Sequence, residues 1–197
     1  VEAYSTAKDD EKLKDIILNL YKVSMSGPFP ESWLIEKAEE FNIKTLEELD
    51  KTKWVEILKD NIRVEVEGFI NMYHKAIELI SDTEGLEAYL DTFRGDLECL
   101  ENVYESLNYG LSEIYAALNG VVFTKLKTVR KSAVFDENAQ GTVKSIRDTV
   151  KKKVKSLIED SFTFTPEESL QGIKDVYPYM KELSRITLDF FDKFNEK

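Results

Sequence analysis

The apolar residues of this chain recur at helical spacing over most of its length, and one stretch is especially regular. From Leu86 to Val121 the intervals between apolar residues alternate between four and three. Such a repeat keeps one stripe of a helix against one partner and is typical of coiled-coil-like packing. It predicts one long helix over about 84–119, which can bend at Gly110, with a helical continuation to about residue 132. The seam consists of Leu86, Leu90, Phe93, Leu97, Leu100, Tyr104, Leu107, Leu111, Ile114, Leu118 and Val121.

Shorter periodic segments predict further helices on both sides of this seam. Gly27 and the prolines after it end the first helix, because glycine favours a left-handed final turn and proline cannot continue a helix. Thr165 caps the last helix, which starts at Pro166 and which Pro178 should kink. Residues 134–141 are predicted as a loop. The helices are expected at about 8–26, 31–41, 45–50, 53–81, 142–161 and from 166 onward.

These elements predict an all-α fold, an elongated antiparallel bundle of six to eight helices with coiled-coil-like heptad packing in the central long helix. The 8 glycines and 4 prolines are too few for the turns of an all-β fold of 197 residues. No Pro- or Ser-rich linker divides the sequence. We therefore predict a single domain over residues 1–197, with about 1–50 as a helical cap on the bundle.

Charge is distributed unevenly along the chain. The formal net charge is −11, yet residues 125–155 hold ten basic and three acidic residues, a net charge of +7. Lys144, Arg147, Lys151 and Lys155 follow one another at helical spacing and should share one helix face. One interpretation is pairing with acidic neighbours inside the bundle. The other is a patch for an anionic partner, such as a lipid headgroup, a sulfated glycan or an acidic protein. The acidic balance of the remainder argues against nucleic acid.

Residues for catalysis or metal binding are scarce. The only histidine is His74, and Asn71 stands where a Glu-x-x-His pair would need a glutamate. The only cysteine, Cys99, is interpreted either as a small buried or half-buried side chain, or as a redox nucleophile or an intermolecular bridge. The chain also lacks phosphate-binding glycine loops and calcium loops. We therefore predict no catalytic residue, no metal site, no cofactor and no enzymatic activity.

Aromatic residues gather near the C-terminus, where two interpretations stand. The residues Tyr177, Met180, Phe190 and Phe194 are either core or the lining of a cavity for an apolar ligand. No apolar run reaches the ~20 residues of a membrane-spanning helix. The start at Val1 is interpreted as the end left by signal-peptide cleavage, and hence as secretion.

Three functional hypotheses follow from these features. The leading one is a secreted, non-enzymatic helical-bundle binding protein that recognises a partner protein or an apolar ligand. The first alternative is a carrier of a lipid or small hydrophobic molecule in a cavity between helices. The second is a coiled-coil scaffold or dimerisation module, in which a second copy completes the heptad seam.

Overall fold

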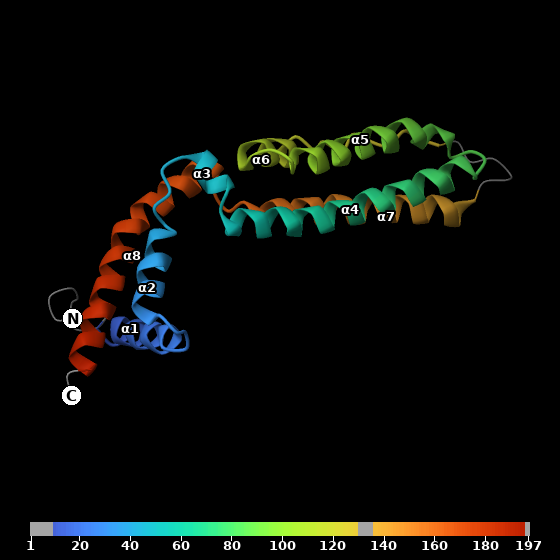
Figure 1. Cartoon of the computed structure of the whole chain (residues 1–197). Coiled ribbons are helices and arrows are strands. Elements are labelled where there is room, and N and C mark those ends of the chain that lie inside the picture. Colours follow the sequence, from blue (N-terminus) through green and yellow to red (C-terminus); the bar gives the residue numbers. More distant parts are fainter. Residues whose placement is uncertain (1–9, 130–135, 196–197) are drawn as a thin grey trace. The chain divides into compact units, whose positions relative to one another are not determined.

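The structure, a computed structural model, describes residues 10–129 and 136–195, apart from the side chains of Asp10, Asp192, Phe194 and Asn195 (Figure 1). Within these ranges every regular element is a helix, so the predicted all-α class is confirmed. The elements are α1 (Asp10–Ser24), α2 (Pro30–Glu39), α3 (Leu46–Asp50), α4 (Lys53–Ser81), η1 (Glu87–Tyr89), α5 (Leu90–Ser106), α6 (Leu111–Asn119), α7 (Glu137–Ser161) and α8 (Pro166–Asn195).

The chain divides into two compact units. Unit 1 consists of residues 1–45 and 168–197, and unit 2 consists of residues 46–167. Unit 1 therefore joins the beginning of the chain to most of α8, which starts at Pro166 as predicted and continues through Pro178. The described residues include no helix long and apolar enough to cross a membrane.

Unit 2 is built around α4, which packs against both α5 and α7 (Figure 1). A short link through η1 returns the chain from α4 to α5, so these two helices are antiparallel. Their inward faces form one continuous apolar core, because residues at helical spacing on each helix all point to the same interior. The fully buried members include Ile62, Phe69, Tyr73, Ile80, Phe93, Leu100, Ile114, Val143 and Val150.

The heptad seam does not form one long helix, and that prediction is wrong. The helix ends at Ser106, and α6 starts after Gly110, whose extended backbone (φ −87°, ψ 175°) leaves the helical path. The new helix start is stabilised from outside, since the Leu111 amide donates to the Asp50 carboxylate at 2.8 Å. Beyond the break the chain runs back along α5, as the 2.9 Å ion pair between Lys127 and Asp91 shows.

The segment after α6 also differs from expectation. Residues 121–129 are not helical, whereas the apolar pattern predicts a helix to about residue 132, and residues 130–132 of that prediction lie outside the described residues. The loop predicted over 134–141 ends earlier than expected, because α7 begins at Glu137. The Asp136 carboxylate caps this helix by accepting from the amides of Asn138 and Ala139.

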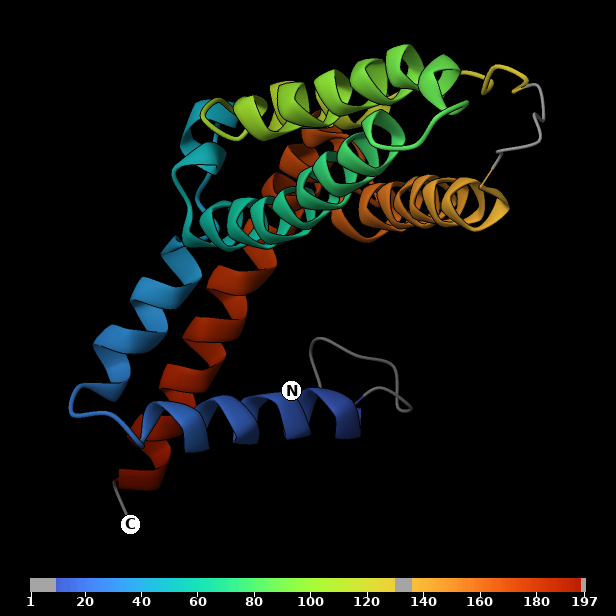
Figure 2. The same ribbon diagram turned by 90° about the vertical axis from the view of Figure 1, so that its right-hand side faces the viewer.

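Unit 1 is formed by α1, α2 and the greater part of α8 (Figure 2). Tyr21 of α1 packs on Phe190 and Phe191 of α8, with ring centroids 5.5 and 4.7 Å apart. The hydroxyl of Tyr177 on α8 donates to the carboxylate of Glu39 at the end of α2. Unit 1 has few buried apolar side chains among its described residues, namely Ile17, Leu34, Ala38, Ile43, Leu170 and Phe191.

Phe93 provides a test of the unit 2 core, because its side chain has 0% exposure and its ring lies 5.2 Å from that of Tyr73. Replacing Phe93 with Ala should lower the free energy of unfolding by about 3–5 kcal/mol, through lost burial and the cavity left behind. The control Val64→Ala, at a side chain that is 69% exposed, should change it by less than ~0.5 kcal/mol. Urea unfolding followed by circular dichroism measures both. A Phe93→Ala effect as small as the control's would contradict this description of the core.

Candidate functional site

Helix α7 presents two faces of different chemistry. Val143, Val150 and Val154 are buried in the core of unit 2, where α7 packs on α4 and α6. Arg147 lies on the same inner face and is only 7% exposed. The predicted basic stripe is therefore divided, and Arg147 does not belong to an exposed patch. The other three members, Lys144, Lys151 and Lys155, are exposed on the outer face.

Arg147 binds the buried carboxylate of Asp96 on α5 through two hydrogen bonds. Its Nε donates to Asp96 Oδ2 at 2.6 Å, and its Nη2 donates to Oδ1 at 3.3 Å. The Tyr73 hydroxyl of α4 donates to the same Oδ2 at 3.0 Å. One carboxylate thus links three helices, and each polar group at this buried site has a partner.

The same guanidinium also fixes the segment that follows α6. Its Nη2 donates to the Thr124 carbonyl at 2.6 Å, and the guanidinium carbon lies 5.6 Å from the centroid of the Phe123 ring. No buried side-chain nitrogen or oxygen among the described residues lacks a hydrogen-bond partner. Arg147 therefore has a structural role, as the interpretation of pairing inside the bundle allows.

The buried site shifts the pKa of two of its groups. Burial raises the pKa of Tyr73 well above its usual value, because the phenolate would lose its hydration, and the neighbouring Asp96 carboxylate adds to this shift. Burial alone would lower the pKa of Arg147, but the hydrogen bond and charge of Asp96 outweigh it and raise that pKa. Arg147 thus stays protonated and Tyr73 stays neutral at physiological pH.

The outer face of α7 carries lysines with few partners. Lys155 Nζ lies 3.6 Å from Glu159 Oε1, and Lys153 Nζ lies 3.7 Å from Oε2 of Glu65 on α4. Within the described ranges, no ion pair involves Lys144, Lys151 or Lys152, which are all exposed. One acidic residue, Asp148, is exposed among them. These lysines can meet anionic groups without first breaking an intramolecular pair.

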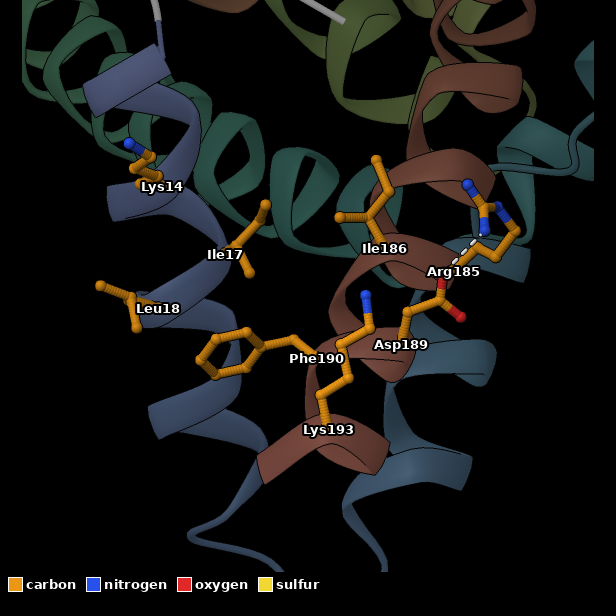
Figure 3. Close-up of a pocket in the computed structure, with 8 residues that line it drawn as sticks. All are labelled: Lys14, Ile17, Leu18, Arg185, Ile186, Asp189, Phe190 and Lys193. Atoms are coloured by element: carbon orange, nitrogen blue, oxygen red, sulfur yellow. Dashed lines mark hydrogen bonds and ion pairs between the residues drawn. The ribbon is translucent and has the colours of Figure 1, made fainter. Parts of the chain in front are cut away.

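The predicted apolar-ligand lining does not come together as one site. Tyr177 and Met180 are half-buried, and the Tyr177 hydroxyl is bound to Glu39. Phe190 alone lines a groove between α1 and α8, with a volume of about 490 Å³ (Figure 3). The Phe194 side chain lies outside the described residues. The groove is lined by Lys14, Ile17, Leu18, Arg185, Ile186, Asp189, Phe190 and Lys193.

The α1 side of this groove can be recognised in the sequence, although the predicted apolar-ligand lining did not include it. Lys14, Ile17, Leu18 and Tyr21 fall on one face of a helix, at i, i+3, i+4 and i+7. Their spacing does not indicate which other helix they meet. The part of the chain that the structure describes contains no group of three or more potential metal ligands. Cys99 is a free, half-buried thiol.

Removing Asp96 should strongly destabilise unit 2, because it leaves the Arg147 guanidinium buried and unpaired. Asp96→Ala is expected to lower the free energy of unfolding by about 3–5 kcal/mol. Replacing both partners by apolar residues, as in Asp96→Leu with Arg147→Met, should recover much of that loss. Urea unfolding of both variants measures the difference. A double variant no more stable than the single one would show that the unpaired charge is not the cause.

Tyr73 should make stability depend on alkaline pH. Its pKa is raised in the folded state, so above about pH 10 the unfolded chain releases a proton that the folded chain retains. The wild-type protein should then lose about 1.4 kcal/mol more per pH unit above pH 10 than Tyr73→Phe does. Denaturant unfolding of both proteins between pH 8 and about pH 11 tests this. Parallel pH profiles would contradict the assignment.

Known proteins resemble this chain over its whole length, although no family model matches it. Three curated relatives are each named as the A subunit of an ATP-dependent helicase/nuclease. The chain is 46% identical to that of Clostridium botulinum, 43% to that of Clostridium beijerinckii and 34% to that of Clostridium novyi, each over 197 residues.

These similarities overturn several predictions. The prediction of a secreted, non-enzymatic binding protein is wrong, and so is the alternative of a lipid carrier, because the relatives' name denotes an enzyme. The exclusion of nucleic acid is wrong as well, since helicases and nucleases act on it. Secretion, inferred from Val1 alone, conflicts with the same names. The net charge of −11 could not predict contact with nucleic acid, because it describes these 197 residues and not the longer proteins that they match.

The relatives are much longer than this chain. The match covers 100% of the chain but only 16% of each of the three relatives. Over its whole length, then, the chain is similar to a limited region of the A subunit of an ATP-dependent helicase/nuclease.

Proposed function

We propose that this chain is an all-helical part of the A subunit of an ATP-dependent helicase/nuclease. The observation that carries the proposal is the 46% identity over all 197 residues. The similarity extends over the whole chain and therefore includes both units of the fold. The proposed whole protein couples ATP hydrolysis to the unwinding and cleavage of nucleic acid, in keeping with the relatives' name.

The role proposed for this region is to support that activity by contacting nucleic acid. The buried ionisable cluster of unit 2, Asp96, Arg147 and Tyr73, is fully engaged in holding helices together. It therefore offers no accessible acid or base for hydrolysis. ATP hydrolysis and bond cleavage would fall to the rest of the longer protein.

The outer face of α7 is the proposed contact surface. Lys144, Lys151 and Lys152 are exposed and form no ion pair with another described residue. A lysine that neutralises a phosphate releases a condensed counterion, which makes such contacts favourable and dependent on salt. The anionic partner for which the lysine stripe was predicted would then be the phosphate backbone.

The chemistry of this face favours backbone contact over base recognition. α7 contains no aromatic side chain, so it has no platform on which an unpaired base could stack. Its one arginine, Arg147, is buried and cannot reach a base edge. Binding through lysines alone carries little sequence information.

A lysine-neutralised variant of the complete subunit tests the proposal. Lys144→Gln, Lys151→Gln and Lys152→Gln together should weaken binding to a DNA fragment and lower the salt slope of log K by about 1 for each phosphate that is no longer neutralised. ATP hydrolysis without DNA should stay unchanged. Fluorescence anisotropy over a series of salt concentrations measures the slope.

The matched control is Lys174→Gln, an exposed lysine of α8 in unit 1. It should leave both the affinity and the slope as in the wild type. Unchanged DNA binding in the triple variant would refute the contact surface. A complete protein without ATP-dependent unwinding or nuclease activity would refute the proposed function itself.

A further inference from the structure

Unit 1 leaves much of its apolar surface uncovered. Among its described residues, Ile16, Val23, Met25, Phe29, Ile35 and Tyr179 are large apolar side chains with roughly half or more of their surface exposed. The buried apolar core, by contrast, lies in unit 2. A unit of this size is only marginally stabilised by the apolar area that it buries, and exposed apolar surface is a common site of further protein contact. The apolar surface of unit 1 is therefore suited to packing against another body.

The groove between α1 and α8 is the most defined part of that surface (Figure 3). Ile17 and Leu18 line it from α1, and Ile186 and Phe190 line it from α8. Ile17 is buried, but Leu18 is 40% exposed. A helix of 15 residues is marginal in water by itself, so α1 depends on contacts along this face.

Ring packing around Tyr21 joins the two helices. Tyr21 packs on Phe190 with a T-shaped geometry and on Phe191 with a tilted one. Leu18 and Lys14 lie one and two turns before Tyr21 on the same face of α1. Here the groove remains open, and no described side chain fills it. On α8 its lining extends from Arg185 to Lys193, which is about two helical turns.

The charges at the groove define what can occupy it. Lys14 from α1 and Lys193 from α8 line it, and neither forms an ion pair with a described residue (Figure 3). Asp189, the only acidic residue in the lining, is 2.8 Å from Arg185 and thus already neutralised. The lining presents apolar side chains and two unpaired cations. An amphipathic helix with carboxylates beside its apolar stripe complements both features.

The length of the relatives indicates which polypeptide can supply such a helix. The chain matches 16% of each relative, so a protein of that kind has a large further polypeptide available to unit 1. We propose that the α1–α8 groove holds an acidic amphipathic helix from the part of the same subunit that lies outside these 197 residues. This inference rests on the proposed function, because it requires the chain to belong to a longer protein.

Cysteine labelling in the complete subunit tests whether the groove is covered. Leu18→Cys places a thiol in the groove, and Lys12→Cys places one on the opposite side of α1 as the control. Maleimide labelling, followed peptide by peptide with mass spectrometry, should be about tenfold slower at residue 18 than at residue 12. Equal labelling rates would overturn the proposal.

Charge variants then test the occupant. Lys14→Glu together with Lys193→Glu should raise the labelling rate at Leu18→Cys towards that of the control, because carboxylates would now repel the helix. The matched pair Lys14→Arg and Lys193→Arg keeps the charge and should keep the protection. Protection that survives charge reversal would overturn the acidic character of the occupant.

Carbodiimide cross-linking identifies the segment directly, since it joins lysine amines to nearby carboxylates. Lys14 and Lys193 should link to acidic residues of one segment outside the 197 residues, within one molecule. Links between isotopically distinct molecules would instead show a second copy and overturn the proposal. A protein with an open groove that still unwinds DNA with ATP would remove this inference and leave the proposed function standing.

Discussion

The buried pairing of Arg147 with Asp96 is the interaction on which the architecture of unit 2 depends. It joins α7 to α5. Asp96 also accepts a hydrogen bond from Tyr73 of α4, and Arg147 donates one to the Thr124 carbonyl of the segment after α6. Taking two charges out of water is costly, so the pair contributes little net stability compared with an apolar replacement. Its effect is geometric, since hydrogen bonds of this one pair connect all four segments.

That geometric role determines which side of α7 meets solvent. With Arg147 directed inward, the neighbouring positions at helical spacing must hold Val143, Val150 and Val154 against the core. Lys144, Lys151 and Lys152 then have to face outward. The proposed nucleic-acid surface therefore depends on a side chain that never touches it. Arg147 and the lysines are alike in charge, but their environments give them opposite roles.

The two units differ in how their apolar residues are used. Unit 2 buries its apolar stripes within itself, which provides a rigid support for a charged outer face. Unit 1 exposes apolar side chains and an open groove, whose lining includes two lysines that form no ion pair with a described residue. This contrast fits the proposed place in a larger enzyme, in which one unit contacts other protein and the other contacts nucleic acid.

The sequence by itself determined the helical class and most helix boundaries. Gly27 with the prolines after it, and Pro166 at the start of α8, act locally, and local backbone preferences can be recognised without the fold. It also determined which residues of the heptad seam are apolar enough to be buried. The sequence by itself did not predict the function, because helical periodicity and charge do not identify the longer proteins that the chain resembles.

Only the tertiary structure decided how those segments meet. The seam from Leu86 to Val121 has the same periodicity whether it forms one helix or two helices separated by a turn at Gly110. Asp50, sixty-one positions away, stabilises the second helix start, and no local pattern contains that contact. Likewise, Arg147 and Lys144 are both basic residues of one helix, and their separation depends on the buried carboxylate of Asp96. Periodicity specifies which residues share a face, whereas long-range partners specify what that face contacts.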